Sequence, residues 1–388
     1  MEPEDFTPEA PGRPIKNLDG AWTFLPNPLP PDIPPSWDLV QHLSAADRAL
    51  SELAGVARNL PNPHLLINPF VRREAVLSSR IEGTQTSLSE LFFFEASEQG
   101  ETSHTDRSDV EEVINYVNAL EYGLLNLRDR PISLALLREM HERLMQGVRG
   151  QDKSPGRFRT KQNWIGQRGF SLERATYVPP PATHLTTLLG DLESYIRTPD
   201  ALPPLVRLAL IHYQFEAVHP FEDGNGRIGR LLITLLLCAE DLLPEPLLYL
   251  SAFFERNRDA YLGLLLAVSR SGAWSEWVTF FLRGVAEQSR DAVNRSIRLL
   301  HLRESYRQQL QSARSTLSLR LVDELFLYPA MTVPRMAKRL GVTPRAVHLI
   351  VDKLIEMEIL REATGRQRNR VFLAPAIIGI IEAPEANA

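Results

Sequence analysis

The chain has 388 residues, of which 44% are hydrophobic and 23% are charged, and its formal net charge at pH 7 is -5. This length predicts two or three domains, and the composition is typical of a globular protein. The net charge excludes a global attraction to nucleic acids or anionic membranes, although a local basic patch stays open. The one cysteine, Cys238, excludes an internal disulfide and a multi-cysteine metal site, and we expect it to be a buried hydrophobe.

Neither a secretory signal nor a membrane span is predicted. The amino terminus, MEPEDFTPEA, is acidic and has no apolar core. The longest run dominated by aliphatic residues, 231–238, has eight residues, whereas a membrane span needs about 20. We therefore expect a cytoplasmic protein without a membrane partner.

The first part of the chain divides into a proline-rich arm and a helical body. Ten of the 29 prolines lie in residues 1–35, which predicts an extended arm. From residue 36 onward, apolar residues recur at three- and four-residue intervals, as on amphipathic or buried helices. The intervals predict helices over residues 36–60, 68–83, 107–127, 133–148, 182–196, 203–217 and 228–241.

Residues 156–181 break the helical pattern. Aromatic and β-branched residues lie on both sides of Gly166 and Gly169, which favours a β-hairpin. The prolines at 179–181 end its second arm, because proline cannot donate a hydrogen bond to a sheet.

The composition changes again near the carboxyl end. Residues 291–315 are rich in arginine and glutamine and predict a polar linking helix. Three helical segments follow, and Thr332 and Thr343 are placed to cap the second and third of them. Residues 361–374 have two short arms and a polar tip with a glycine, as in a β-wing. Together these features predict a winged helix-turn-helix domain.

The stretch HPFEDGNGRIGR, residues 219–230, carries the strongest chemical signal. Gly224 and Gly226 precede a buried helix, where successive backbone N–H groups can face one concavity at the positive end of the helix dipole. Arg227 and Arg230 lie three residues apart and project from one helix face. Two guanidinium groups of fixed charge suit a di- or triphosphate. The spacing and the lysine of a Walker A loop are absent.

Three polar side chains complete this stretch. Asp223 can hold Mg²⁺ that bridges phosphate oxygens, and the side-chain amide of Asn225 can donate to a phosphate. A neutral His219 can take a proton from an incoming hydroxyl group.

With these residues in place, HPFEDGNGRIGR resembles the HxFx[DE]GNGRxxR signature of Fic-domain proteins, and the wider resemblance runs from about residue 68 to 290. It implies an all-α, mainly helical Fic fold with a β-hairpin flap, followed here by the winged helix-turn-helix domain. It also implies a homodimer and a protein adenylyltransferase, which transfers AMP from ATP to Ser, Thr or Tyr hydroxyls of target proteins and of itself and releases pyrophosphate.

The resemblance assigns roles to individual residues. It implies that His219 is the general base and that Asp223 is the ligand of Mg²⁺ or Mn²⁺. It implies that the ATP phosphates are held by Gly224, Asn225, Gly226 and Arg227, with Arg230 on the γ-phosphate. The flap, residues 156–181, would hold the target segment as an added strand. Asn257 and Tyr261 become candidates for the nucleoside, with a tyrosine on a buried helix face as the alternative.

A second, shorter motif lies at VLSSRIEGTQ, residues 76–85. Gly83 is typical of a helix carboxyl terminus, so Glu82 falls in the last turn, where the helix dipole disfavours a carboxylate. A solvated glutamate is one interpretation. Ser78, Glu82 and Gly83 also match the inhibitory motif [ST]xxxE[GN] of Fic-domain proteins. That resemblance implies that Glu82 pairs with Arg230 and blocks the γ-phosphate, or also orients water for the reverse reaction, removal of AMP.

The function of the winged helix is open from the sequence. Residues 316–388 contain ten Lys or Arg against eight Asp or Glu, so an attraction to DNA through residues 316–374 would be weak. Arg366, Arg368 and Arg370 on the wing favour DNA, whereas Asp352, Glu356 and Glu358 favour a protein-binding or dimerising module. A nucleotide-sensing DNA-binding regulator, and an enzyme with another nucleotide donor, are the alternatives to the adenylyltransferase.

These patterns divide the chain into five parts. They are the proline-rich arm at 1–35, an amino-terminal helical region with the inhibitory motif at 36–110, a Fic catalytic core at 111–290, the linking helix at 291–315 and the winged-helix domain at 316–388.

Overall fold

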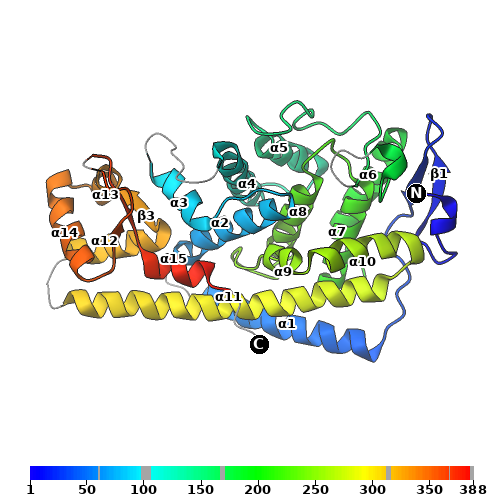
Figure 1. The fold of residues 1–388 in the computed structure, drawn as a ribbon. Coiled ribbons are helices and arrows are strands. Elements are labelled where there is room, and N and C mark those ends of the chain that lie inside the picture. The colour runs from blue at the N-terminus through cyan, green and yellow to red at the C-terminus, as the bar shows by residue number, and fades with distance from the viewer. Residues whose placement is uncertain (60–61, 98–105, 167–170, 312–315, 367, 385–388) are drawn as a thin grey trace.

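The computed structural model describes residues 1–59, 62–97, 106–166, 171–311, 316–366 and 368–384. Helices dominate it, as predicted (Figure 1). The α-helices are α1 Trp37–Arg58, α2 His64–Ile81, α3 Leu88–Ala96, α4 Arg107–Asn126, α5 Leu134–Leu144, α6 Leu185–Arg197, α7 Pro204–Val218, α8 Asn225–Ala239, α9 Ser251–Arg256, α10 Arg258–Ser271, α11 Trp274–Gln311, α12 Thr316–Leu327, α13 Val333–Leu340, α14 Pro344–Glu356 and α15 Pro375–Glu382. The strands are β1 Gly12–Lys16, β2 Trp22–Pro26, β3 Ala330–Thr332, β4 Arg361–Glu362 and β5 Val371–Leu373.

The long helix α11 runs under the whole molecule and packs along α1 (Figure 1). Helix α1 buries a stripe rich in alanine and leucine, which lets the two helices approach closely. The prediction of a separate linking helix at 291–315 is wrong, because those residues up to 311 continue the helix that begins at Trp274. No proline interrupts residues 274–311, so nothing ends the helix earlier. Residues 312–315 lie outside the described residues.

The predicted extended arm contains a β-hairpin. Strands β1 and β2 pair antiparallel, with Gly12 opposite Pro26 and Lys16 opposite Trp22. The side chain of Asn17 accepts hydrogen bonds from the backbone of Asp19 and Ala21 and forms the turn. The prediction of an extended arm over 1–35 therefore missed this hairpin, because the proline content obscured a local turn signal.

Helices α7 and α8 form the centre of the helical core. Helix α7 is buried from Leu205 to Val218, and α8 is buried from Asn225 to Leu237 except at Gly226. Helix α2 packs against α4, α8 and α9, so the segment that carries the inhibitory motif is part of the core (Figure 1). Within the described residues, no helix is both long and apolar enough to cross a membrane.

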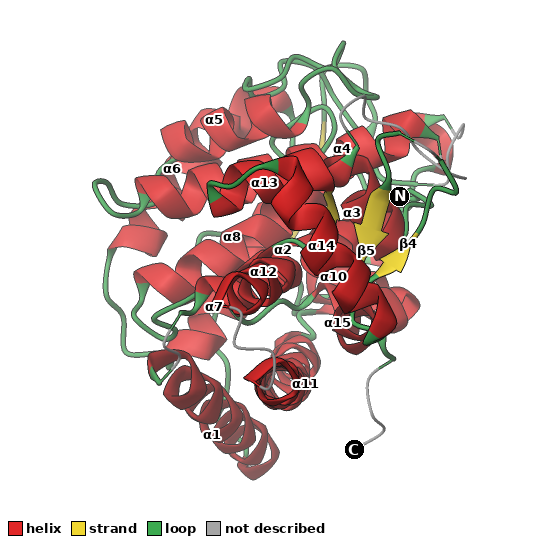
Figure 2. Cartoon of the chain, turned by 90° about the vertical axis from the view of Figure 1, so that its left-hand side faces the viewer, coloured by secondary structure: helices red, strands yellow, loops and turns green. Residues whose placement is uncertain are grey.

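The predicted winged-helix domain is confirmed. The domain consists of α12, α13, α14 and a three-stranded sheet in the order β3-β5-β4. Strand β3 lies between α12 and α13 in the chain, and β4 and β5 follow α14 (Figure 2). The hydroxyl groups of Thr332 and Thr343 accept hydrogen bonds from the backbone of Arg335 and Ala346, which confirms both predicted caps. Helix α15 follows the wing and packs back on α11, α2 and α3.

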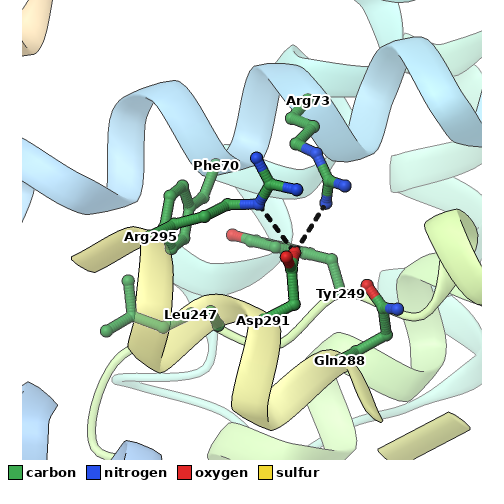
Figure 3. A pocket seen from close by; sticks show the side chains of 8 residues that line it. Phe70, Arg73, Leu247, Tyr249, Gln288, Asp291 and Arg295 are labelled. Atoms are coloured by element: carbon green, nitrogen blue, oxygen red, sulfur yellow. Dashed lines mark hydrogen bonds and ion pairs between the residues drawn. The ribbon is translucent and has the colours of Figure 1, made fainter. Parts of the chain in front are cut away.

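Charged contacts join this domain to the core. Asp291 on α11 lies 2.7 Å from Nε of Arg295 and 3.7 Å from Nη1 of Arg73 on α2, at the edge of a small cavity (Figure 3). Arg295 also donates hydrogen bonds to the carbonyl groups of Ile380 and Ala383, at 2.5 and 2.8 Å. One buried arginine therefore satisfies the carboxyl end of α15, where helix carbonyls have no partners within the helix.

Candidate active site

The loop between α7 and α8 contains the 219–230 stretch. His219 has φ +48° and ends α7, and Gly224 has φ +76° and precedes α8. Asn225 closes the loop, because its Oδ1 accepts from the N–H of Phe221 at 2.8 Å and its Nδ2 donates to the carbonyl of Phe221 at 2.9 Å. The expectation that the Asn225 amide donates to a phosphate is therefore not met in this conformation. Its backbone N–H at the start of α8 remains suited to an anion.

His141 on α5, which the sequence did not indicate, packs against the loop that contains residues 219–224. His141 on α5 has no exposed surface and stacks on Phe221 with ring centroids 3.8 Å apart. Its Nε2 donates to the carbonyl of Asp223 at 3.0 Å, and its Nδ1 accepts from the N–H of Gly156 at 2.9 Å. Burial lowers the pKa of His141 to about 4, so the ring is neutral at pH 7. This neutral ring therefore holds the 219–224 loop in place against α5.

His219 is held from three sides. Its Nδ1 lies 3.2 Å from the carbonyl oxygen of Glu216, and its own carbonyl accepts from Nε of Arg159 at 2.9 Å. Asn163 donates to the same carbonyl at 3.3 Å. Burial lowers the pKa of His219 to about 4, and the Glu216 carbonyl partly opposes that change. The imidazole is therefore neutral, and with Nδ1 as donor its Nε2 can accept a proton.

The flap is fixed to this loop at its base. Arg159 donates to the carbonyls of Pro180 and Val218, at 2.6 and 3.3 Å. Tyr177 donates to the carbonyl of Ala217 at 2.9 Å, two residues before His219. Among described residues, the pairing between the two arms is one antiparallel bridge, Ile165 with Tyr177, and residues 167–170 lie outside the description.

The amino-terminal hairpin contacts the second arm of the flap. The N–H of Phe24 in β2 donates to the carbonyl of Val178 at 3.0 Å. The ring of Phe24 lies 6.2 Å from that of Tyr177, centroid to centroid. The arm thus braces the flap base.

Asp223 lies at the entrance to the cradle, the concavity formed by the backbone N–H groups of residues 224–226 at the start of α8. Its Oδ1 accepts from the N–H of Gly224 at 2.6 Å, and its side chain is 45% exposed. Arg227 lies 3.9 Å away. The described residues contain no group of three or more His, Cys, Asp or Glu placed to hold a metal. One carboxylate open to solvent beside a phosphate cradle matches Mg²⁺, which is held by one or two carboxylates together with substrate phosphates.

Arg227 has a buried partner that the sequence did not indicate. Its Nη1 lies 3.3 Å from Oε2 of Glu112 on α4, and both side chains are almost inaccessible. Arg149 also lies 3.3 Å from Glu112. Burial raises the pKa of Glu112, and the two arginines act against that rise. Arg227 is therefore anchored from behind while it lies beside the loop.

Arg230 is turned to α2 and bound there. Its Nη2 lies 2.7 Å from Oε1 of Glu82 and 3.1 Å from the carbonyl of Ser78, and its Nε donates to the hydroxyl of Ser78 at 2.8 Å. Burial acts to raise the pKa of Glu82, but Arg230 and then Arg227 outweigh it and the net shift is downward. Glu82 is therefore ionised at pH 7.

The same carboxylate lies at the start of α8. A Cβ atom at position 226 would lie 2.5 Å from Oε1 of Glu82, so only glycine allows this approach. Helix α2 ends as predicted, with Glu82 as its cap residue and Gly83 at φ +103°. The carboxylate thus leaves the end of its own helix and occupies the positive end of another.

Glu74, one further residue that the sequence did not single out, fixes α2. It is 2% exposed and accepts from the hydroxyls of Tyr116 at 2.9 Å and Ser251 at 2.5 Å. Helices α4 and α9 thereby hold α2 in register with Arg230.

The two candidate nucleoside residues are placed differently. Tyr261 is 2% exposed, stacks on Phe254 at 4.4 Å and contacts Nε2 of His212 through its hydroxyl at 2.7 Å. Asn257 is half-buried and donates to the carbonyl of Phe253. The placement of Tyr261 favours the alternative, a tyrosine in the core.

Comparison with known proteins agrees with this geometry. The model described as Fic/DOC family N-terminal matches residues 40–125, and the model described as Fic/DOC family matches residues 131–237. The chain carries a Fic domain. A model described as HTH DNA binding domain matches residues 319–372 of this Fic-domain protein.

Curated relatives share part of the chain. A probable protein adenylyltransferase of Aquifex aeolicus is 27% identical over 202 residues, which are 50% of this chain and 54% of the relative. A protein adenylyltransferase of Caenorhabditis briggsae is 30% identical over 138 residues, 34% of this chain and 25% of the relative. The chain thus matches about half of the first and a quarter of the second.

Solved structures show the fold. A Fic family protein from Desulfovibrio desulfuricans is 20% identical with a TM-score of 0.57, covering 89% of this chain and 98% of that one. A Fic domain containing signaling protein from Bacteroides thetaiotaomicron is 18% identical with a TM-score of 0.51, covering 66% of this chain and 96% of that one. The Fic fold of the core is therefore shown.

Proposed function

We propose that this protein is a protein adenylyltransferase that transfers AMP from ATP to hydroxyl groups of target proteins and of itself. The observation that carries the proposal is the arrangement around the start of α8. A neutral His219, a solvent-exposed Asp223 and a glycine-bounded helix terminus with two arginines meet there. The curated relatives named above bear the same activity in their names.

In the proposed reaction, His219 acts as the general base. Nε2 takes the proton of a Ser, Thr or Tyr hydroxyl while its oxygen attacks the α-phosphorus. The bond from that phosphorus to the bridging oxygen breaks, and pyrophosphate leaves with the electron pair. The neutral ring is available for this step because burial keeps its pKa at about 4.

The cradle would bind the triphosphate. The backbone N–H groups of Gly224, Asn225 and Gly226 lie at the positive end of α8, and Arg227 is fixed beside them by Glu112. Arg230 would bind the γ-phosphate, as an arginine suits a phosphate through paired N–H groups. Asp223 would hold Mg²⁺ or Mn²⁺ together with phosphate oxygens, and such an ion neutralises phosphate charge when bound.

Glu82 would inhibit this reaction, and we call its contact with Arg230 the brake. Its carboxylate lies on Arg230 and against Gly226, in the space and charge environment that a γ-phosphate needs. An ATP bound beside it would lack the Arg230 contact and would place its phosphates differently. Helix α2 is fixed by Glu74, so the inhibitory contact is built into the core.

The target segment is proposed to dock on the flap, residues 156–181, as an added strand. The flap base is tied to the catalytic loop through Arg159 and Tyr177. A hydroxyl on a segment aligned along the flap would therefore meet His219 at a fixed distance.

The test is incorporation of labelled AMP by the wild type and two variants. Glu82→Gly is expected to raise incorporation at least tenfold, because it frees Arg230 to contact the phosphate in the transition state. One such contact changes a rate by about tenfold or more. His219→Ala in the Glu82→Gly protein is expected to abolish it. Mass spectrometry of the self-modified protein identifies the added group, and UMP, phosphocholine or phosphate in place of AMP would refute the proposed donor.

We propose a second, separate function for the winged helix, the binding of duplex DNA. Its support is the match to the DNA-binding model and the exposed face of α14, where Arg345, His348 and Leu349 are accessible. Arg368 on the wing is exposed as well. A gel shift with mixed-sequence duplex at low salt tests it. No shift in the wild type, or an unchanged shift in Arg345→Ala/Arg368→Ala, would contradict DNA binding.

A further inference from the structure

Glu216 occupies the last turn of α7, directly before the catalytic loop. Its carbonyl oxygen lies 3.2 Å from Nδ1 of His219, and Oε2 of its carboxyl group lies 3.8 Å from the same nitrogen. The side chain is 11% exposed. Two oxygens of one residue thus face one nitrogen of the imidazole, from the side opposite to the nitrogen that accepts a proton.

Space for this carboxyl group is provided by α8. A Cβ atom at Gly229 would overlap with Oε1 of Glu216 and would lie 3.2 Å from the ring of Phe215. Gly229, the third glycine of the 219–230 stretch, therefore makes room for a buried acid rather than for a phosphate.

The carboxyl group is not explained by packing alone. Oε1 of Glu216 is buried and accepts no hydrogen bond from any residue within the described ranges. A buried polar atom without a partner opposes folding, so a site role is the better explanation for its presence.

Charged and titratable groups face Glu216 from three elements. Arg230 lies on α8 and Glu82 at the end of α2, and both are charged. The neutral His219 lies on the following loop, where Arg159 of the flap base contacts its carbonyl oxygen. Burial raises the pKa of Glu216 to about 8, Arg230 acts to lower it, and Glu82 acts to raise it further. Departure of Glu82 from Arg230 would therefore favour the ionised carboxylate.

We propose that Glu216 is a positioning residue for His219, which holds Nδ1 protonated, reserves Nε2 for the target hydroxyl and stabilises the imidazolium once the brake is released. The inference rests on the proposed function of His219 as base. It links the Glu82–Arg230 contact to the base through one carboxyl group, since the carboxylate form is favoured when Glu82 leaves. The hydroxyl proton goes to Nε2, and the proton on Nδ1 stays in place.

The experiment compares Glu82→Gly with Glu82→Gly/Glu216→Gln, because glutamine keeps the size of the side chain and cannot ionise. We expect kcat for AMP transfer to fall about tenfold or more, with KM for ATP changed by less than about threefold. The first protein should show an ionisation in its pH–rate profile between pH 5 and 8, below the pKa of about 8 that holds with Glu82 present, and the second should lack it. Gln214→Ala is the control, since Gln214 lies on the same helix and contacts Asn27 instead.

A second readout does not depend on AMP transfer. The ¹⁵N chemical shifts of His219 report the protonation of its ring, and we expect the imidazolium to form at a higher pH in the Glu82→Gly protein than after Glu216→Gln. The carboxylate stabilises that cation, whereas the backbone carbonyl of residue 216 keeps Nδ1 as the donor in both proteins. Unchanged shifts, or equal kcat and pH profiles, would overturn the role of Glu216. If the two proteins differ in the ionisation of His219 but the Glu82→Gly protein transfers no AMP, only the proposed function would be refuted.

Discussion

Oε1 of Glu82 lies 2.7 Å from Nη2 of Arg230, although 148 residues separate them in the chain. The arginine side chain is 3% exposed and the glutamate side chain 37%. One partner is thus buried permanently, while the other reaches it from the end of a helix. A ligand that replaces Glu82 would need to bring a negative charge, because an unpaired buried guanidinium is costly.

Discrimination between ATP and ADP should depend on this pair. In the wild type, Arg230 is occupied and ATP and ADP are expected to bind with similar Kd. In Glu82→Gly, ATP should bind about tenfold or more tightly than ADP, because an arginine–phosphate contact is charge-assisted and bidentate. Calorimetry with both nucleotides measures the ratio. If the ratio of the two Kd values is the same in Glu82→Gly and in the wild type, Arg230 does not contact the γ-phosphate.

Ser78 contributes a separate part of the contact. Its hydroxyl accepts from Nε of Arg230 at 2.8 Å. Ser78→Ala should raise AMP transfer by about two- to tenfold, less than Glu82→Gly, because a hydrogen bond to a charged group contributes about 1.5–3 kcal/mol and the Ser78 carbonyl contact remains. Ser79→Ala is the matched control, since Ser79 is equally buried and its hydroxyl has no hydrogen-bond partner among described residues. Equal effects of the two variants would assign the change to packing.

Acid should destabilise the core through three buried histidines. Burial lowers the pKa of His141 and His219 to about 4 and that of His212 to about 3, against an ordinary 6.5. The unfolded chain therefore binds protons first as the pH falls below 6.5. The contribution of the three neutral histidines to the free energy of unfolding is complete above that pH. It declines by up to about 1.4 kcal/mol per pH unit for each histidine down to pH 4.

Denaturant unfolding between pH 7.5 and 4.5 measures this dependence. His141→Gln should reduce the slope, whereas His42→Gln, at a partly exposed histidine on α1, should leave it unchanged. Equal slopes in His141→Gln and the wild type would contradict burial of a neutral His141.

The attachment of the winged helix should depend on Arg295. Arg295→Ala removes donors to the end of α15 and leaves Asp291 with Arg73 as its remaining charged contact (Figure 3). We expect the free energy of unfolding to fall by about 3–5 kcal/mol, as it does when other buried ion pairs are broken. We also expect faster proteolysis between α14 and α15. Arg298→Ala, at an exposed position one turn later, is the control. Equal protease resistance in both variants would show that apolar contacts alone hold α15.

Local signals were read correctly from the sequence. Thr332 and Thr343 cap their helices and Gly83 follows the end of α2, since these choices depend on a few neighbouring residues. The same local character let the 219–230 stretch be recognised as a glycine-bounded helix start. Where competing local signals overlapped, as in the proline-rich arm with its Asn17 turn, the prediction failed.

The sequence by itself therefore determined many of the helices, the two threonine caps and the glycine-bounded helix start at residues 219–230, because backbone conformation depends on neighbouring residues. Only the tertiary structure decided which partner each charged side chain meets. It pairs Arg227 with Glu112 and the amide of Asn225 with its own loop, whereas the contact of Arg230 with Glu82 is one that the family resemblance implies. Such pairings depend on which helices pack together, and packing is set by the apolar surfaces of the whole chain rather than by the spacing within one segment.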